Sequence, residues 1–316
     1  MWKKIEHKWK GSDIELKVPD CVKKEYEDDD IICYPPAQEL FTAFNLCHFN
    51  KVRVVIIGQD PYPGEGEADG MAFSMKKLKK KNNPKNSIEH YIIPRLKKVY
   101  PEGKYSDDCG DLSNWATQGV LLLNSALSYT VPSNIIEKTK VRKEKVLNEY
   151  TQKKERFEKL KLKQQEALNS KNTATNKYRE AKKKVTNANN EILKYQKQIT
   201  GLNKEIKDLE NKIKKYKELE LKENPWEDLI KNVLTKINNI EGRKICFLLW
   251  GGNAVNIFNK AVKEPNHIVL TCAHPSPKAE GANFPFSENH HFTTVNLIQE
   301  MQKKEKIDWS IPGLKK

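Results

Sequence analysis

The chain has 316 residues, of which 31% are charged and 37% hydrophobic, and its formal net charge is +15. Its mean hydropathy of −0.77 is unusually polar, and no stretch approaches the roughly 18 consecutive apolar residues of a membrane-spanning helix. The N-terminal segment lacks the apolar core of a signal peptide. We therefore expect an intracellular protein, in the cytoplasm or the nucleus, without a membrane partner. The positive charge indicates a polyanionic partner, although solvated lysines would give the same value.

Six cysteines are scattered along the chain, at positions 21, 33, 47, 109, 246 and 272. None forms a C-x-x-C motif or pairs with a histidine at the spacing of a zinc site. We therefore expect neither a metal nor a cofactor. Isolated cysteines in a chain of this length are typical of a reducing compartment.

The first strong element is an apolar run at 53–57, which ends in Gly58-Gln59-Asp60-Pro61-Tyr62-Pro63. Such a run, bounded by turn residues, is typical of a buried parallel strand. The prolines remove backbone freedom, so the Asp60 carboxylate and the Tyr62 ring are expected to point in fixed directions. An ordinary strand-to-loop turn would have a similar composition.

Three more apolar runs follow along the chain, at 120–123, 245–250 and 267–271. Helical patterns at 88–99 and 226–240 alternate with them. This alternation predicts an α/β fold with a central four-stranded parallel sheet flanked by helices.

Each run ends in polar or small residues. Asn124 follows the second run, Gly251 and Gly252 follow the third, and His274 and Ser276 follow the fourth. The carboxyl ends of parallel strands lie along one edge, where ligands bind in such sheets. Each residue alone has a structural explanation, but a carboxylate, a carboxamide, a histidine and a hydroxyl at four strand ends predict a functional site.

Residues 131–222 differ in composition from the globular segments 1–130 and 223–316. Between 131 and 220 the chain has 25 Lys and Arg against 13 Asp and Glu, a difference of +12. Two series of apolar residues recur every seven positions: Tyr178, Val185, Ile192, Ile199, Ile206 and Ile213, and Ala181, Ala188, Tyr195, Leu202, Leu209 and Tyr216. Sustained heptads predict a Lys-rich coiled coil inserted into a discontinuous globular domain.

A single continuous helix over the insertion would separate its ends by roughly 130 Å. The flanking segments belong to one domain, so an inserted antiparallel helical hairpin that turns near 170–176 is favoured. The alternative is that 136–222 pairs with a second copy and makes a homodimer.

The motifs at the strand ends resemble those of family-1 uracil-DNA glycosylases, in the family's order. The matching stretches are Gly58 to Tyr62, Ala68 and Gly70 to Ser74, Asp111 to Asn124, Phe247 to Gly251, His274 to Pro277, and Ile307 to Trp309. The resemblance spans both globular segments and leaves out only the insertion.

The resemblance implies an enzyme of base excision repair that flips uracil out of single- or double-stranded DNA and hydrolyses the N-glycosidic bond. It implies that Asp60 positions the attacking water and stabilises the cationic sugar. His274 would stabilise charge on the uracil O2, with the Gln59 backbone N–H as a second donor.

The resemblance also assigns residues to recognition. Asn124 would pair with the uracil edge, Phe73 would stack on the base, and Tyr62 would exclude the thymine methyl group. Phosphate contacts are implied for Ser87, Gly251, Gly252 and Ser276.

Four positions depart from the family's pattern. Pro63 and Asp69 stand where the family usually has histidine, and Gly252 stands where it often has serine. Lys278 occupies the position, in the DNA intercalation loop, of a leucine that wedges into the duplex.

A lysine can fill a vacated base position only with its stem. Weaker extrusion from duplex, with a preference for single-stranded DNA, is therefore a hypothesis. Phe284 or Phe286 are alternative wedges.

Two other functions stay open. The fold could serve as a DNA-binding scaffold or polymerase accessory, although Asp60, Asn124, Phe73 and His274 are all present. A glycosylase of relaxed specificity is disfavoured by Tyr62 and Asn124. We expect the lysines of the insertion to extend the DNA footprint, with a protein partner or dimerisation as the alternative.

Overall fold

The computed structural model describes residues 1–29, 31–76, 87–132, 146–162, 179–197, 199–201, 204, 224–279 and 281–312. The chain divides into two compact units. The first joins Met1–Val131 to Glu223–Lys316, and the second is Pro132–Lys222.

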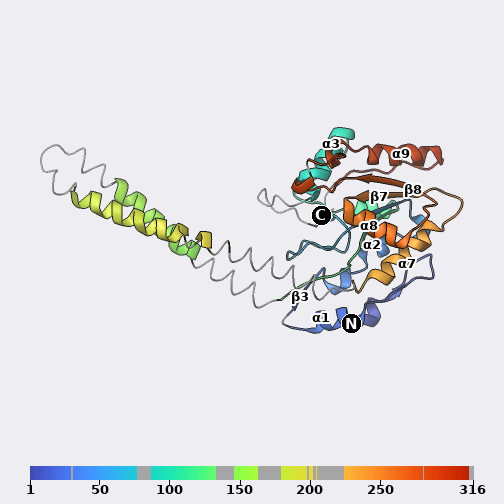
Figure 1. Ribbon diagram of the computed structural model, residues 1–316, viewed down its shortest axis with the longest axis horizontal. Helices are drawn as coiled ribbons and strands as arrows, with labels where there is room; N and C mark the ends of the chain where they lie inside the picture. Colours follow the sequence, from blue (N-terminus) through green and yellow to red (C-terminus); the bar gives the residue numbers. More distant parts are fainter. Residues whose placement is uncertain are drawn as a thin grey trace. The chain divides into compact units, whose positions relative to one another are not determined.

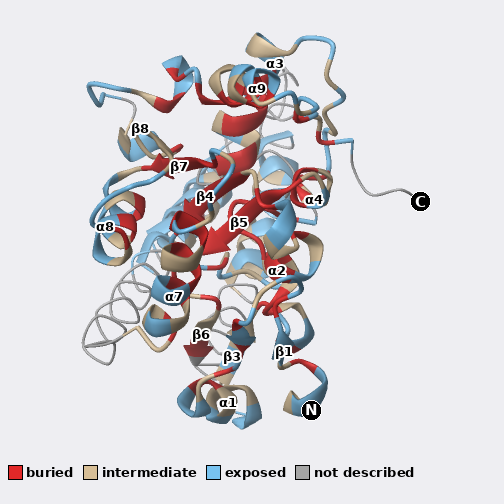
Figure 2. Ribbon diagram, turned by 90° about the vertical axis from the view of Figure 1, so that its right-hand side faces the viewer, coloured by how far each residue is buried: buried red, intermediate tan, exposed pale blue. Residues whose placement is uncertain are grey.

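A four-stranded parallel sheet forms the core of the first unit, in the order β5-β4-β7-β8. Its strands are β4 (Val54–Gly58), β5 (Val120–Asn124), β7 (Cys246–Trp250) and β8 (Ile268–Cys272). Every residue of β4, β5 and β7 is buried (Figure 2), because neither face of the sheet meets water. Burial on both faces explains why these strands are apolar runs without alternation.

Helices lie on both sides of this sheet. The helices of the first unit are α1 (Asp20–Glu27), α2 (Thr42–Leu46), α3 (Ile93–Val99), α4 (Ser113–Thr117), α7 (Glu227–Asn238), α8 (Gly252–Ala261) and α9 (His291–Met301). Helices α3 and α9 lie on one side, and α2, α7 and α8 on the other (Figures 1 and 2). The predicted four-stranded parallel sheet flanked by helices is confirmed, and each predicted strand lies within one residue of its observed bounds.

The helix predicted at 88–99 consists of a π-helical turn at Ile88–Ile92 followed by α3, and the helix predicted at 226–240 is α7. Two small sheets complete the strands: β1 (His7–Lys8) pairs with β2 (Glu15–Leu16), and β3 (Ile31–Tyr34) pairs with β6 (Tyr129–Pro132). Short 3-10 turns occur at Trp2–Lys4, Ala37–Glu39, Phe49–Lys51, Pro277–Ala279 and Phe286–Glu288.

Three aromatic rings join α4, α9 and the C-terminal segment. Trp309 lies 5.0 Å from both Trp115 and Phe292, measured between ring centroids. Edge-to-face contacts of this kind stabilise beyond the apolar area that they bury. The packing explains why Trp309, far from the sheet in sequence, belongs to its core.

The segments that leave and re-enter the first unit are joined directly. Asn224 donates from Nδ2 to the Ser125 carbonyl oxygen at 2.7 Å. Trp226 donates from Nε1 to Ser128 Oγ at 2.9 Å and is almost wholly buried. The segment that follows the insertion therefore packs against the residues just after β5.

The second unit contains helical residues at 146–162 and 179–197. Lys153 Nζ lies 2.7 Å from Glu191 Oε2, so the two helices are in contact. Within 179–200, the described residues that are not exposed are Ala181, Val185, Ala188, Ile192, Tyr195 and Ile199. All six are predicted heptad positions, as expected where one stripe of a helix packs against a neighbour.

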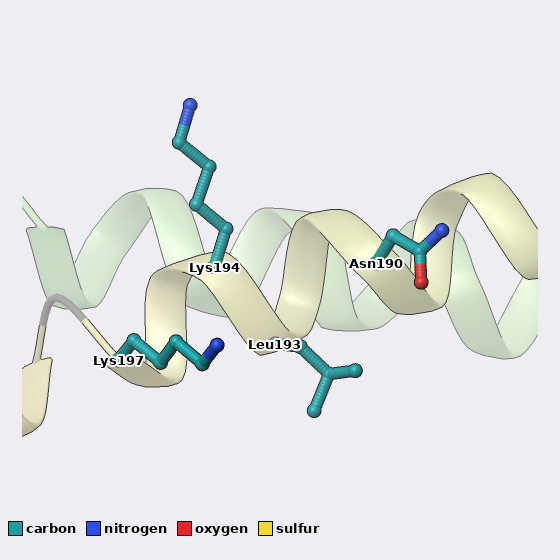
Figure 3. Close-up of a pocket in the computed structure, with 4 residues that line it drawn as sticks. All are labelled: Asn190, Leu193, Lys194 and Lys197. Carbon is teal, nitrogen blue, oxygen red and sulfur yellow. The ribbon is translucent and has the colours of Figure 1, made fainter.

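The complete antiparallel hairpin stays a prediction, because its turn near 170–176 and the heptad positions Tyr178, Leu202, Ile206, Leu209, Ile213 and Tyr216 lie outside the described residues. A shallow groove of about 550 Å³ on the second helix is lined by Asn190, Leu193, Lys194 and Lys197. Lys194 and Leu193 point to opposite sides of the helix (Figure 3). The lining has neither carboxylate nor histidine, so we assign it no catalytic role.

In the part of the chain that the structure describes, no helix is both long enough and apolar enough to cross a membrane. The intracellular location stays a prediction.

Candidate active site

A cavity of about 300 Å³ lies at the carboxyl edge of the parallel sheet. Its lining residues are Gly58, Gln59, Asp60, Pro61, Tyr62, Pro63, Ala68, Gly70, Met71, Phe73, Ser87, Asn124, Tyr129 and His274. Seven of the predicted site residues are therefore brought together: Gln59, Asp60, Tyr62, Phe73, Ser87, Asn124 and His274. Gly251, Gly252, Ser276 and Lys278 do not line the cavity.

The position of the Asn124 side chain depends on Gly58, which has no side chain of its own. Gly58 and Asn124 are paired residues of the neighbouring strands β4 and β5. A Cβ atom added to Gly58 would stand 2.2 Å from Asn124 Oδ1 and 2.8 Å from the Cβ of Ala72. Real Cβ atoms do not approach so closely, because the overlap is strongly repulsive. Glycine therefore leaves the space in which the carboxamide reaches the cavity.

Hydrogen bonds hold the loop after β4 against the chain after β5. The Ser125 backbone N–H donates to the Gly58 carbonyl oxygen at 3.1 Å, and Ser125 Oγ donates to the Gln59 carbonyl oxygen at 2.7 Å. Asn253, at the start of α8, donates from Nδ2 to Gln59 Oε1 at 2.6 Å. The segment that carries Asp60 is thus tied to two other elements, while the Asp60 side chain is exposed at the cavity.

Phe73 forms one wall of the cavity in a strained backbone conformation. Its φ is +63°, a left-handed value that costs a bulky residue about 1–2 kcal/mol. Its ring lies 5.1 Å from Trp250 and 5.8 Å from His274 between centroids. Phe73 is only 9% exposed, and these ring contacts fix its apolar face at the cavity.

Asp69 holds the segment that carries Phe73. Its carboxylate accepts from the Met71 backbone N–H at 3.2 Å and from Ser74 Oγ at 2.6 Å. Ser74 Oγ in turn accepts from the Leu112 backbone N–H at 3.0 Å. Asp69 is only 2% exposed, and this burial, with the nearby Asp111, raises its pKa to about 7.

Gly251 leaves room for His274. Burial lowers the pKa of His274 below its ordinary value, so the imidazole is neutral at pH 7. Gly251 has φ +93°, and a Cβ there would lie 2.8 Å from the Cβ of His274. The Ser276 backbone N–H donates to the His274 carbonyl oxygen at 2.8 Å. Gly251 and Ser276 therefore lie beside His274, outside the cavity lining.

Tyr62 presents its ring to the cavity. Its hydroxyl is shielded from solvent and has no hydrogen-bond partner among the described residues. Burial raises the pKa of Tyr62, and the nearby Asp69 and Glu67 raise it further. The phenol is neutral and acts as a bulky, mainly apolar wall.

A second histidine supports the cavity from behind. Trp250 donates from Nε1 to His291 Nδ1 at 3.1 Å. Burial lowers the pKa of His291 to about 4, which keeps this nitrogen available as an acceptor. The hydrogen bond fixes the indole on which Phe73 packs. Sequence reasoning missed His291, and also Tyr129 and Asn253, because no motif singles them out.

The loop after His274 corrects one expectation. Phe286 is 3% exposed and its ring lies 4.9 Å from that of Trp250, so the idea that it serves as a wedge is wrong. Phe284 is 78% exposed. Lys278 lies in the exposed turn Pro277–Ala279.

Across the described residues, no group of three or more His, Cys, Asp or Glu side chains could hold a metal ion.

Asp69→Asn tests the buried carboxyl. Because the folded pKa of about 7 lies above the unfolded value of 3.8, the folded state binds a proton that the unfolded state releases. Stability contributed by this proton is complete below about pH 4 and is lost as the pH rises to 7. The wild-type free energy of unfolding should fall relative to Asp69→Asn by roughly 2–4 kcal/mol between pH 4 and 8.

Urea unfolding across that range is the measurement. Asp228→Asn, which removes one exposed carboxylate of α7, controls for the loss of a surface charge. If the free energy of unfolding changes with pH in the same way for wild type and Asp69→Asn, the raised pKa of Asp69 is contradicted.

Known proteins resemble this chain along most of its length, although no family model matches it. The uracil-DNA glycosylase of Saccharomyces cerevisiae is 26% identical over 311 residues, and the match covers 94% of this chain but only 61% of the yeast protein. The uracil-DNA glycosylase of Mycoplasmopsis pulmonis is 28% identical over 291 residues, covering 92% of this chain and 87% of the relative. The uracil-DNA glycosylase of Phocaeicola vulgatus is 38% identical over 136 residues, and this match covers 39% of this chain and 56% of the relative.

The crystal structure of a mimivirus UNG variant in complex with UGI shares the fold, with a TM-score of 0.52 and 19% identity over 92% of this chain and 81% of that one. The relatives named above are all uracil-DNA glycosylases. Residues from several of the motifs that resemble that family line the cavity at the sheet edge. Over most of its length the chain is similar to these uracil-DNA glycosylases, and it shares the fold of the mimivirus enzyme.

Proposed function

We propose that this protein removes uracil from DNA by hydrolysing the N-glycosidic bond, which leaves an abasic site for base excision repair. The observation that carries the proposal is the meeting of a carboxylate (Asp60), a carboxamide (Asn124), a neutral imidazole (His274) and an aromatic face (Phe73) in one cavity of about 300 Å³. This set suits a flipped pyrimidine base attached to a sugar.

In the proposed reaction, the C1′–N1 bond breaks and its electron pair goes to the uracil. The sugar develops oxocarbenium character, and water forms the new bond to C1′. Asp60 is proposed to orient this water, to stabilise the cationic sugar and to take the water's proton. A carboxylate can do this because it is an acceptor with unit negative charge.

His274 is proposed to stabilise the leaving uracil. Since burial keeps the imidazole neutral, it can donate one hydrogen bond to O2 as charge grows there. The Gln59 backbone N–H is the proposed second donor. Donors already in place at developing charge contribute about 3–4 kcal/mol each.

Recognition of uracil is proposed to rest on three side chains. Asn124 donates to O4 and accepts from N3–H, a pattern that cytosine does not present. Phe73 stacks on the base, and the bulky Tyr62 ring opposes C5, where thymine carries a methyl group. Discrimination against thymine is then a steric clash rather than an attraction.

Contacts to the phosphates are proposed for Ser87, Ser276 and the backbone of Gly251 and Gly252. Ser87 lines the cavity and precedes the π-helical turn. Gly252 is the first residue of α8, where N–H groups that the helix does not use favour anions. The Gly251 N–H already donates to the Cys272 carbonyl oxygen at 2.8 Å. Lys278 is exposed in the turn Pro277–Ala279. We propose that this turn is the DNA intercalation loop and that Lys278 lies next to the bound DNA strand.

Segments 1–130 and 223–316 are proposed to form the glycosylase domain, and 131–222 an inserted Lys-rich coiled-coil hairpin. The insertion is proposed to extend the DNA footprint. In support, Asn224, which follows the insertion, donates to the carbonyl oxygen of Ser125, the residue after the cavity residue Asn124. A protein partner or a homodimer through 136–222 is the alternative.

Asp60→Asn tests the chemistry, because it removes the charge and keeps the shape. The rate of uracil release from a single-stranded uracil oligomer should fall by about 10²–10⁴-fold, the usual worth of a general base. Binding of the oligomer should persist.

Asp228→Asn serves as the matched control, since it makes the same change on the exposed face of α7. A wild-type protein that binds DNA and releases no uracil would establish the DNA-binding scaffold instead. An Asp60→Asn variant with the wild-type rate would refute the role of Asp60.

Replacing 136–222 with a short linker tests the insertion. If its lysines contact phosphates, log affinity against log salt should become less steep by about 0.9 for each lost contact, because fewer counterions are released. Affinity for duplex oligomers titrated between 50 and 200 mM salt, a range in which such contacts dominate, is the measurement. An unchanged slope, together with a loss of dimer in sedimentation, would favour the homodimer.

A further inference from the structure

One aromatic side chain of the first unit has no place in the proposed site or in the core. Phe284 is 78% exposed. Among the large hydrophobic side chains that are exposed in the described part of the chain, it is the only aromatic ring. A phenylalanine exposed to this degree forgoes most of the stabilisation that burial of its ring would give, so its position calls for an explanation.

The backbone around Phe284 is anchored on both sides next to the cavity. Its carbonyl oxygen accepts from the backbone N–H of Ala273 at 2.8 Å, and Ala273 directly precedes His274. Two residues later, Phe286 is buried against Trp250, which packs on Phe73. Pro285 lies between the two aromatic residues and restricts the backbone. The ring of Phe284 is therefore presented from a restrained segment.

We propose that Phe284 enters the duplex at the position that the flipped nucleotide vacates, and so determines how well the enzyme acts on double-stranded DNA. This inference rests on the proposed function. Extruding a base leaves a gap in the stack, and apolar side chains inserted between base steps offset the lost stacking. A flat aromatic ring does this better than the charged end of Lys278, which keeps water bound.

The location of Phe284 fits this task, because the DNA strand that carries the flipped nucleotide must pass the rim of the cavity. Phe284 is joined to the rim through Ala273 and lies outside the lining. The proposal also separates two substrates. Single-stranded DNA has no base pair to open and no gap to fill, so its cleavage should not need this ring.

Phe284→Ala is the test, with uracil release measured on one sequence as single strand and as U:G duplex. We expect the duplex rate to fall about tenfold or more, in keeping with the worth of stacking on an aromatic side chain, while the single-strand rate stays within twofold. Phe284→Leu should recover most of the duplex rate, because leucine is also an apolar wedge.

Leu297→Ala is the matched control, since it removes another exposed apolar side chain, 61% exposed on α9. Lys278→Ala tests the competing wedge. Equal losses on both substrates with Phe284→Ala, no loss on either, or a selective duplex loss with Lys278→Ala alone would overturn the proposal.

A second readout separates this inference from the proposed function. Binding to a duplex that contains a tetrahydrofuran abasic analogue requires no catalysis and already contains the gap. Wild type should bind it more tightly than the intact duplex, and Phe284→Ala should lose that preference. If wild type releases no uracil, the proposed function fails, while this binding preference still decides the role of Phe284; its absence in wild type would overturn that role.

Discussion

The site depends on one place in the sheet where two strands approach without a side chain between them. Gly58 on β4 pairs with Asn124 on β5, and the missing Cβ leaves the space that the carboxamide fills. Because the strands are parallel, the same register brings the loop with Asp60 beside Asn124. The carboxyl edge of a parallel sheet is a general place for ligand binding. In this protein a glycine decides which side chain occupies that edge.

The cavity wall behind Asn124 is built from restrained polar and aromatic groups. Phe73 keeps a left-handed backbone because Asp69, Ser74 and the Leu112 N–H form a buried chain of hydrogen bonds around it. Each such bond contributes about 1 kcal/mol, enough in sum to offset the strain.

The neutral His291 orients Trp250, which packs on Phe73. Gly251 and Gly58 play parallel roles, since each leaves room for a functional side chain on a neighbouring segment. The proposed catalytic groups therefore stand on a rigid frame, as positioning within a fraction of an ångström requires.

Much of this arrangement could be predicted from the sequence, because burial on both faces of a parallel strand leaves a continuous apolar run and each run here ends in polar or small residues. The strands, the edge and the cavity residues at the strand ends follow from that pattern, whereas Phe73 and Ser87 follow only from the family resemblance. The near-neutral pKa of Asp69 follows from neither, since it arises from burial among side chains distant in sequence. No sequence motif singles out His291, Tyr129 or Asn253. Phe286, an alternative wedge by sequence, packs on Trp250 instead. An aromatic residue in a polar loop can face either way, and only the tertiary contacts decide.

The most direct measurement is uracil release by Gly58→Ala, Asn124→Ala and the double variant, each checked for folding by circular dichroism. If Gly58 exists to admit the Asn124 carboxamide, both single substitutions remove the same group from the cavity. Their losses in kcat/KM should then be similar, and the double variant should be about as active as either single variant, because coupled residues are not additive. A folded Gly58→Ala enzyme with the wild-type rate, or losses that simply multiply, would contradict this view of the site.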